Sequence, residues 1–488
     1  MKRIREYFIF CTAIFIAISI FSPDSLQAQK GQKIFRAGAA TSNITPFLGG
    51  GLVGNFGTPP PALYVHDELH CRCLVLDDGG TKLAFVIVDN IGMDRGLIDA
   101  AKHLINKETD LPESNIMVSA IHTHSSVSSQ GPNEKRTGWN NDQEYDQYQS
   151  FLIRRIADVV RIALANLEPA RIGWGAGDVP QHVFVRRYTM KPGTPTPNPF
   201  GGQDKVVMNP GVGNPNVLEP NSKPDPEVSF ISLQSISGRP IALLANYSLH
   251  YVGGVPANHI SGDYFAMFAD RIQERLKADR QEPPFVAIMS NGTSGNVNNI
   301  NVLGQPEKNP PYAKMRRVAD DVANEVLRVH GTISYNDWVP LKAAQEELSL
   351  KSRKPDEKLI ARAKMVLARP DTVKPFHRHE VAYAQRTLQM LGWPEEVDIV
   401  LQAFRIGDLG VAAIPFETFA QTGLEIKQKS PFKQTFTIEL ANGSYGYLPT
   451  PEEHEVGGYE TWLGTNRVEI EASRKIVAKL LALFAKME

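Results

Sequence analysis

The sequence has few cysteines, no excess charge of either sign and no apolar run as long as a membrane-spanning helix. Lys and Arg number 52 and Asp and Glu number 53, so no net field favours binding to nucleic acid or to an anionic membrane. A Gly-x-Ser-x-Gly elbow is also absent, which argues against a serine hydrolase of that kind. Apolar residues make up 42% and charged residues 22%. This ordinary globular composition excludes a disordered or fibrous chain.

The three cysteines provide neither an easy disulfide nor a strong metal site. Cys11 lies in an apolar N-terminal stretch that export would remove, which leaves Cys71 and Cys73. Side chains two positions apart in a strand point the same way but are too far apart for an easy disulfide. Two thiolates alone also make a weak metal site. We expect both thiols to be buried as small apolar groups.

The N-terminus has the layout of a secretory signal peptide. Lys2, Arg3 and Arg5 precede an uncharged, mostly apolar stretch at 7–21, and the small residue Ala28 follows. The alternative is an uncleaved anchor, but this stretch is shorter than the roughly 20 residues that a spanning helix needs. We therefore predict a signal peptide at 1–28, no stable membrane span after export, and a secreted or periplasmic protein.

The remaining chain, 29–488, alternates predicted strands and helices without an evident interdomain linker, which indicates a single α/β domain. We expect strands at 74–76, 83–89, 115–121, 241–249 and 285–289, and two more within 398–416. We expect helices at 145–167, 265–277, 313–330, 418–429 and 466–487, and a charged helical insertion at 341–369. The segment 190–226 is rich in Pro, Gly and Asn. It is too long for an ordinary loop between two elements. It is either a functional lid or rim of the site, or a surface loop without such a role.

Two predicted strands end in histidine. His122 and His124 follow an apolar strand, and their spacing would place both imidazoles on one face of it. His250 ends the apolar strand at 241–249. A single histidine in such a place is more often structural, but two matching strand ends together suggest a metal site.

Carboxylate, tyrosine and asparagine side chains could complete this site. Glu417 follows an apolar strand at the start of a predicted helix, where it either complements the helix terminus or binds a metal. Two histidines and one glutamate are a standard zinc set that leaves room for a water. A Gly-rich turn carries Tyr445 and Tyr447, Tyr459 lies beyond it, and Asn298 lies in a small, polar, Gly-rich loop. Structural packing of the two aromatic rings is the alternative to a role in the site.

Taken in order, these segments resemble the catalytic domain of the neutral ceramidases. The resemblance rests on Ala37 to Ala40 with Ile44 to Pro46, His122 to Ser125, Ser248 to His250, Asn258, His259, Asp263, Pro415 to Thr418, Val185 with Arg186, Tyr447 and Tyr459. It implies layered mixed β-sheets flanked by helices. It also implies a Zn²⁺ held by His122, His250, Glu417 and Tyr447, and substrate-side roles for His124, Tyr459 and Arg186.

Two departures from the family pattern concern the substrate and the domain content. Asn298 stands where the family has a serine that contacts the substrate hydroxyl, and no C-terminal sandwich domain is expected within 29–488. The resemblance therefore implies an exported zinc amidohydrolase acting on an N-acyl, ceramide-like lipid, in sphingolipid metabolism. The alternatives are a hydrolase acting on an extracellular glycan or its acyl groups, and a non-catalytic, metal-stabilised binding protein. In each case the expected ligand is a small molecule, lipid-like or glycan, and not nucleic acid.

Overall fold

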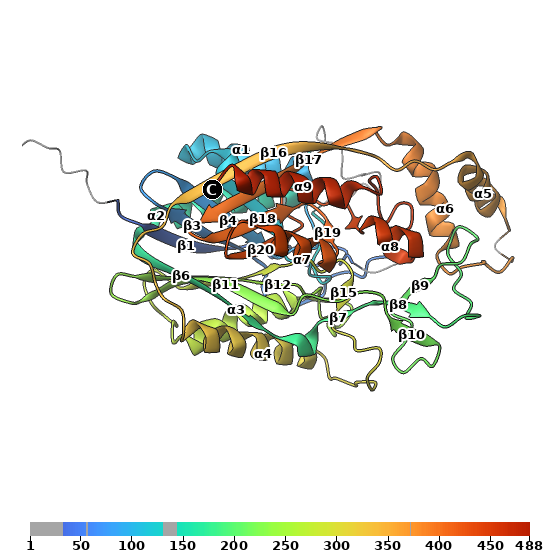
Figure 1. Cartoon of the computed structure of the whole chain (residues 1–488), viewed down its shortest axis with the longest axis horizontal. Helices are drawn as coiled ribbons and strands as arrows, with labels where there is room; N and C mark the ends of the chain where they lie inside the picture. Colours follow the sequence, from blue (N-terminus) through green and yellow to red (C-terminus); the bar gives the residue numbers. More distant parts are fainter. Residues whose placement is uncertain (1–32, 55–56, 130–143, 371) are drawn as a thin grey trace, which may run out of the picture. The chain divides into compact units, whose positions relative to one another are not determined.

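The computed structural model describes residues 33–54, 57–129, 144–370 and 372–488. The predicted signal peptide lies outside these residues. An eight-stranded sheet forms the centre of the unit Ile34–Glu488 (Figure 1). From one edge to the other its strands are β14 (Val286–Asn291), β12 (Pro240–Tyr247), β11 (Glu227–Ser235), β6 (Glu168–Asp178), β1 (Arg36–Asn43), β3 (His70–Asp77), β4 (Lys82–Val88) and β5 (Ile116–Ala120).

The sheet is mixed because two of its pairs are parallel. β12 pairs with β14, and β4 with β5, in parallel register, whereas the other neighbours are antiparallel. β4 and β5 are buried at almost every position, as expected for strands that are covered on both faces. Cys71 and Cys73 are buried and unpaired in β3, which confirms the prediction for these thiols.

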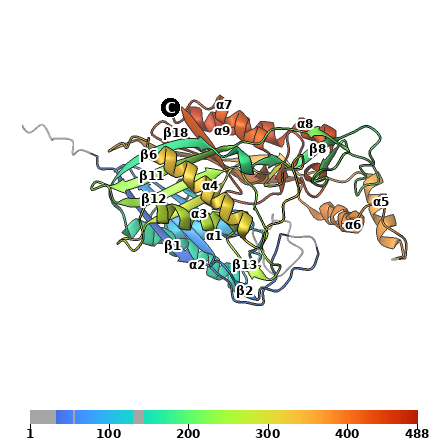
Figure 2. The same cartoon turned by 90° about the horizontal axis from the view of Figure 1, so that it is seen from below.

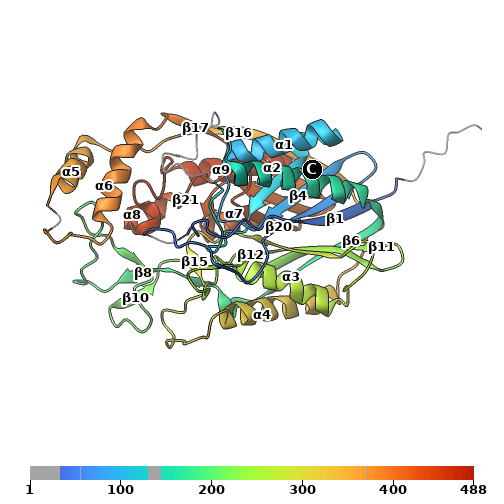
Figure 3. The same ribbon diagram turned by 180° about the vertical axis from the view of Figure 1, so that it is seen from behind.

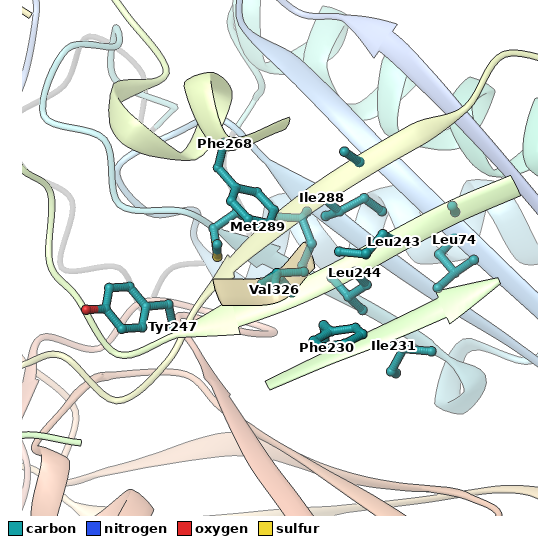
Figure 4. Close-up of a cluster of buried hydrophobic side chains, with 14 of the residues drawn as sticks. Leu74, Phe230, Ile231, Leu243, Leu244, Tyr247, Phe268, Ile288, Met289 and Val326 are labelled. Atoms are coloured by element: carbon teal, nitrogen blue, oxygen red, sulfur yellow. The ribbon is translucent and has the colours of Figure 1, made fainter. Parts of the chain in front are cut away.

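Four helices cover one face of this sheet. They are α1 (Arg95–Thr109), α2 (Gln147–Ala165), α3 (Asp263–Arg275) and α4 (Ala313–His330). Gly38 of β1 faces the backbone of α2, and Gly177 of β6 faces Glu325 of α4. Figure 2 shows α3 and α4 over β11 and β12, and Figure 3 shows α1 and α2 beside β4. Phe268 and Val326 of these helices pack with Ile288 in the core (Figure 4).

A four-stranded sheet covers the opposite face. Its strands, in order, are β16 (Leu341–Lys351), β17 (Glu396–Ile406), β18 (Leu409–Ile414) and β20 (Gln434–Glu439). Phe85 of β4 meets Phe404 of β17 with ring centroids 5.0 Å apart. The outer face carries α7 (Ala420–Lys429) and α9 (Ala472–Ala485). The predicted α/β class, with layered mixed sheets flanked by helices, is confirmed.

One predicted element is wrong. The segment 341–369 was expected to be helical, but its first part is the strand β16 and only α5 (Glu357–Ala368) is a helix. Ala, Glu and Lys in β16 favour a helix locally. The strand forms because all its residues pair with β17, so tertiary pairing outweighs local preference.

The segment 190–226 is partly ordered into sheet. β9 (Val206–Met208) and β10 (Val217–Pro220) flank β8 (Arg187–Met190). The remaining elements are η1 (Glu113–Asn115), η2 (Pro180–His182), η3 (Met390–Gly392), η4 (Tyr459–Thr461), α6 (Glu380–Gln389), α8 (Pro451–Val456), β2 (Tyr64–Val65), β13 (His259–Ile260), β7 (Phe184–Val185), β15 (Val297–Asn298), β19 (Glu417–Thr418) and β21 (Tyr447–Leu448). Among the described residues, no helix has the length and apolarity needed to cross a bilayer.

Candidate metal centre

His122 lies just beyond the end of β5, where the chain turns sharply. Its φ angle is 72°, a left-handed conformation that is uncommon for residues other than glycine. The prediction that His122 and His124 share one face of a strand is therefore wrong, because the extended run stops at Ala120. The imidazoles meet nevertheless, with the Nε2 atom of His124 3.1 Å from the Nε2 atom of His122.

His250 reaches the same point from a strand near the opposite edge of the eight-stranded sheet. It follows β12 by three residues and is almost fully buried. Its Nε2 atom lies 3.1 Å from the Nε2 atom of His122. These histidines are 128 residues apart in the sequence and come from strands that are not neighbours. The prediction that they meet is confirmed.

Glu417 and Tyr447 are brought together by a short parallel pair of strands. Glu417 in β19 is the register partner of Tyr447 in β21. The Glu417 Oε2 atom lies 3.3 Å from His122 Nε2 and 3.7 Å from His250 Nε2. The side chain of Tyr447 lies close enough to the Glu417 carboxylate to lower its pKa. Glu417 does not begin a helix as predicted, because it lies in β19 and α7 starts only at Ala420.

The geometry of His122, His250 and Glu417 fits a zinc ion. Zinc ligands lie about 2.0–2.1 Å from the metal, so two ligands of a tetrahedral site are about 3.3 Å apart. The three observed separations of 3.1, 3.3 and 3.7 Å bracket that value. The Glu417 Oε2 atom is buried without a hydrogen-bond partner among the described residues. A cation between these atoms would compensate the buried charge.

The hydrogen bonds behind the histidines also suit metal binding. His122 Nδ1 lies 2.7 Å from the carbonyl oxygen of Ile91, and His250 Nδ1 lies 3.2 Å from that of Ser294. Each Nδ1–H can thus donate outward, which leaves the Nε2 lone pair facing the centre of the site. This is the usual support of metal-binding histidines.

Burial and neighbouring charges set the protonation states. Burial, together with His122 and Arg186, holds the pKa of His250 well below its ordinary value. Burial also opposes ionisation of Glu417, but His122 and Tyr447 outweigh it and lower the pKa of this carboxyl. Glu417 in turn raises the pKa of His122 against the effect of burial. His250 is therefore held neutral and Glu417 ionised, whereas the proton on His122 would have to leave when a metal binds.

His124 belongs to the same group of ligand atoms. His122, His124 and His250 each offer one nitrogen, and these atoms lie within 4.8 Å of one another. The ring of His124 stacks on Tyr251 with centroids 3.7 Å apart, which fixes its orientation. His124 is thus a fourth candidate ligand as well as the substrate-side group that the sequence predicted.

Arg186 and Tyr459 lie around Tyr447. The Arg186 guanidinium is 5.1 Å from the centroid of the Tyr447 ring. The Tyr459 ring lies 5.6 Å from the Tyr447 ring. Arg186 is itself held by Glu460, with Nε donating over 2.7 Å to a carboxylate oxygen. Both predicted residues therefore border the candidate metal ligands.

Asn298 is close to this group but is hydrogen-bonded within the fold. It pairs with Phe184 between β15 and β7, two residues before Arg186. Its Nδ2 atom donates to Asn209 over 2.7 Å, and its Oδ1 atom accepts from the backbone of Ile300 over 3.0 Å. Both ends of the amide therefore have a partner within the protein.

No protein-family model matches the chain, but solved structures do. A neutral ceramidase from Pseudomonas aeruginosa matches with a TM-score of 0.70 and 15% identity, over 93% of this chain and 74% of that one. A structure described as ceramidase complexed with C2 matches with a TM-score of 0.66 and 14% identity, over 93% of this chain and 75% of that one. The chain has the neutral ceramidase fold.

Glu439 is a buried residue of this ceramidase fold that sequence reasoning missed. It ends β20 and accepts hydrogen bonds from the backbone and hydroxyl of Ser294 and from the backbone of Thr418. Ser294 orients His250, and Thr418 follows Glu417. Burial raises the pKa of Glu439 to about 8. Only the polarity of this residue in an apolar strand, Thr-Phe-Thr-Ile-Glu, could have drawn attention to it.

Proposed function

We propose that this protein is a zinc-dependent hydrolase that cleaves an N-acyl amide of the ceramide type. The observation that carries the proposal is the convergence of His122, His250 and Glu417 at zinc-like spacing in a neutral ceramidase fold. His122, His250, Glu417 and Tyr447 would hold the ion. When bound, zinc supplies Lewis acidity and a water whose pKa is lowered to about 7.

The protein's own side chains account for the remaining requirements of amide hydrolysis. Water adds across the C–N bond, so that the acyl carbon gains the oxygen and the leaving nitrogen gains a proton. Tyr447, whose ring lies against the Arg186 guanidinium, would donate its single hydroxyl proton to the developing oxyanion while its oxygen faces the ion. Burial and the positive charge of Arg186 lower the pKa of His124, so a proton that it accepts is readily passed to the leaving nitrogen.

The outer residues serve substrate binding in this proposal. Tyr459 contacts Tyr447 and would touch the part of the substrate beyond the reacting bond. Asn298 would shape the adjoining wall through its bond to Asn209. The signal-like pattern at 1–28 supports export, so we propose that the enzyme acts outside the cytoplasm on a lipid-like substrate.

Removal of both metal-binding imidazoles tests the proposal. We expect the variant His122→Ala/His250→Ala to lose zinc, measured by elemental analysis, and to lose hydrolysis of N-acyl amides. His103→Ala is the matched control, because His103 lies on α1 with a side chain that is 75% exposed. Full activity in the double variant would end the proposal.

A panel of substrates separates the proposal from the two other predicted functions. Release of amine from N-acyl lipids supports amide hydrolysis. Turnover confined to acylated or uronic glycans would assign the site to carbohydrate instead. Bound zinc without turnover of either class would indicate a metal-stabilised binding protein.

A further inference from the structure

A segment without charged residues lies next to the candidate metal site. From Asn43 to Val65 the chain contains no Asp, Glu, Lys, Arg or His, although charged residues make up 22% of the whole sequence. The segment begins at the end of β1 and ends in β2, which pairs with β13 (Figure 2). Its described parts, 43–54 and 57–65, are called the uncharged loop below.

The uncharged loop presents large apolar side chains to solvent. In its first part Phe47 is 87% exposed and Leu48 56%, and in its last part Leu63 is 63% exposed and Tyr64 53%. Backbone hydrogen bonds hold the two parts side by side. Single exposed apolar residues are common on proteins, whereas a group of them marks a binding surface.

The backbone of the uncharged loop suits an apolar environment. The N–H of Gly49 donates to the carbonyl of Ala62, and the N–H of Ala62 donates to the carbonyl of Gly50, each over 2.8 Å. Pro46 and all three residues of 59–61 are prolines, which have no N–H. Donors that are paired or missing cost little when hydrocarbon replaces water. A protein partner, in contrast, makes hydrogen bonds across its interface. The loop therefore favours lipid over protein.

An apolar groove runs from the uncharged loop to the start of α2. Its volume is about 670 Å³, and its walls include Phe47, Val127, Tyr148 and Phe151. Asp146 is the one carboxylate among the lining residues, and its side chain is engaged as the N-cap of α2. The volume is in the range of sites for whole ligands, about 300–1,000 Å³. Such walls suit an alkyl chain.

The uncharged loop also contacts the candidate metal site. A Cβ atom at Gly54 would lie 2.6 Å from the ring of His124. The N–H of Val53 donates to the carbonyl of Ser126 over 3.0 Å, and Val127 of the groove is the next residue. A lipid surface that held this loop would therefore lie beside the candidate metal ligands.

We propose that the uncharged loop and the start of α2 bind the surface of a lipid bilayer. Phe47 and Leu48 enter the region of the acyl chains, and the groove takes one alkyl chain. Tyr64 has an apolar ring and a polar hydroxyl, which suits the level of the headgroups. The attraction is apolar and not electrostatic, since the loop has no charge. This inference goes beyond the proposed function and does not depend on turnover.

Vesicle binding tests the surface. The full-length protein and the variant Phe47→Ser/Leu48→Ser are centrifuged with vesicles of zwitterionic phosphatidylcholine at low and at high salt. We expect the partition coefficient of the variant to be lower by about 10-fold or more at both salt concentrations, because two apolar side chains no longer leave water on binding. Wild-type binding that disappears at high salt would indicate an electrostatic attraction and overturn the inference.

The matched control is Ile34→Ser/Ile236→Ser. It also removes two exposed apolar side chains, but at the opposite end of the eight-stranded sheet. Ile34 precedes β1, whose other end leads into the uncharged loop, and Ile236 lies in the turn between β11 and β12. We expect wild-type partition for this control. Equal partition of the two double variants would contradict the proposal.

A fluorescence measurement locates the inserted residue. We expect the new indole in Phe47→Trp to be quenched by phosphatidylcholine with brominated acyl chains, beyond the quenching of the wild-type protein. Ile236→Trp should show no such excess. Absence of excess quenching in Phe47→Trp would overturn the inference, and a dimer that Phe47→Ser/Leu48→Ser dissociates would then assign the surface to a second copy of the chain. Excess quenching in a protein that hydrolyses no N-acyl amide would support the bilayer surface and reject only the proposed function.

Discussion

At the scale of single residues, the site depends on side chains that bind nothing themselves but hold the ligands in place. Glu439 is the main example, since it accepts bonds from Ser294 and Thr418. These residues connect it to His250 and Glu417, respectively. Side chains of this kind fix the orientation of metal ligands. Their loss affects the metal more than the overall fold.

We predict that Glu439→Gln weakens zinc binding about 10- to 100-fold, in line with the usual cost of such changes. The amide offers one acceptor in place of two and turns a donor toward Ser294 or Thr418. Competition with a zinc chelator measures the affinity. Glu425→Gln on the surface of α7 is the control. Wild-type affinity in Glu439→Gln would show that Glu439 does not position the ligands.

Tyr447→Phe separates catalysis from structure at this site. The ring and its contacts with Arg186 and Tyr459 are kept, whereas the hydroxyl donor is lost. We expect kcat to fall about 100-fold or more with a smaller change in KM, because an oxyanion donor acts mainly in the transition state. Steady-state kinetics on the preferred amide provide both constants. A normal kcat would remove Tyr447 from the mechanism.

At the scale of elements, close packing between strands and helices fixes where the strand ends lie. Gly38 in β1 allows α2 to approach so closely that an added Cβ atom would lie 2.2 Å from the Ala163 carbonyl oxygen. We predict that Gly38→Ala destabilises the protein by about 3 kcal/mol, because backbone must move to admit the methyl group. Thermal unfolding measures the loss. Gly331→Ala, whose nearest atom would lie 3.6 Å away, should unfold near the wild-type temperature.

Helix α1 carries a buried lysine that makes stability depend on pH. Burial lowers the pKa of Lys102 from 10.5 to about 7. As pH falls from 10.5 to 7, the unfolded chain binds a proton that the folded protein does not, so stability is lost over this range. We expect Lys102→Met to add about 4 kcal/mol at pH 7 but only about 1 kcal/mol at pH 10. Chemical denaturation at the two pH values checks this, and an equal gain at both would contradict it.

The sequence predicted elements well where local pattern and tertiary packing agree. The helix expected at 145–167 is α2, with the apolar stripe of Leu152, Ile156 and Val160 buried. The strand β16 was missed because its residues favour a helix and only β17 makes them extended. The convergence of His122, His250 and Glu417 was predicted because their strands end in polar groups, and their role as ligands stays a prediction. Glu439 was missed because its role depends on contacts between distant segments.

At the scale of the whole molecule, the candidate metal ligands link the two sheets of the core. His122 and His250 follow strands of the eight-stranded sheet, whereas Glu417 follows β18 of the four-stranded sheet. A bound ion would therefore hold the sheets together at one end. Binding to the folded state alone stabilises it by about 2.7 kcal/mol at 100 times the dissociation constant.

We therefore expect a metal chelator to lower the unfolding temperature of the wild-type protein, and added zinc to restore it. The variant His122→Ala/His250→Ala should show neither effect. Calorimetric scans with and without chelator make the comparison. An equal response of both proteins to the chelator would place the stabilising ion elsewhere.

The wide sequence separation of these ligands has a consequence for biosynthesis. A ribosome that has just incorporated His250 must still synthesise the segment up to Glu417. This takes on the order of 10–30 s at about 5–20 residues per second. During that interval the nascent chain has two imidazoles but neither the carboxylate nor the phenol. A half-made chain thus lacks a complete candidate site, and the hydrolysis proposed above could begin only after β19 and β21 have paired.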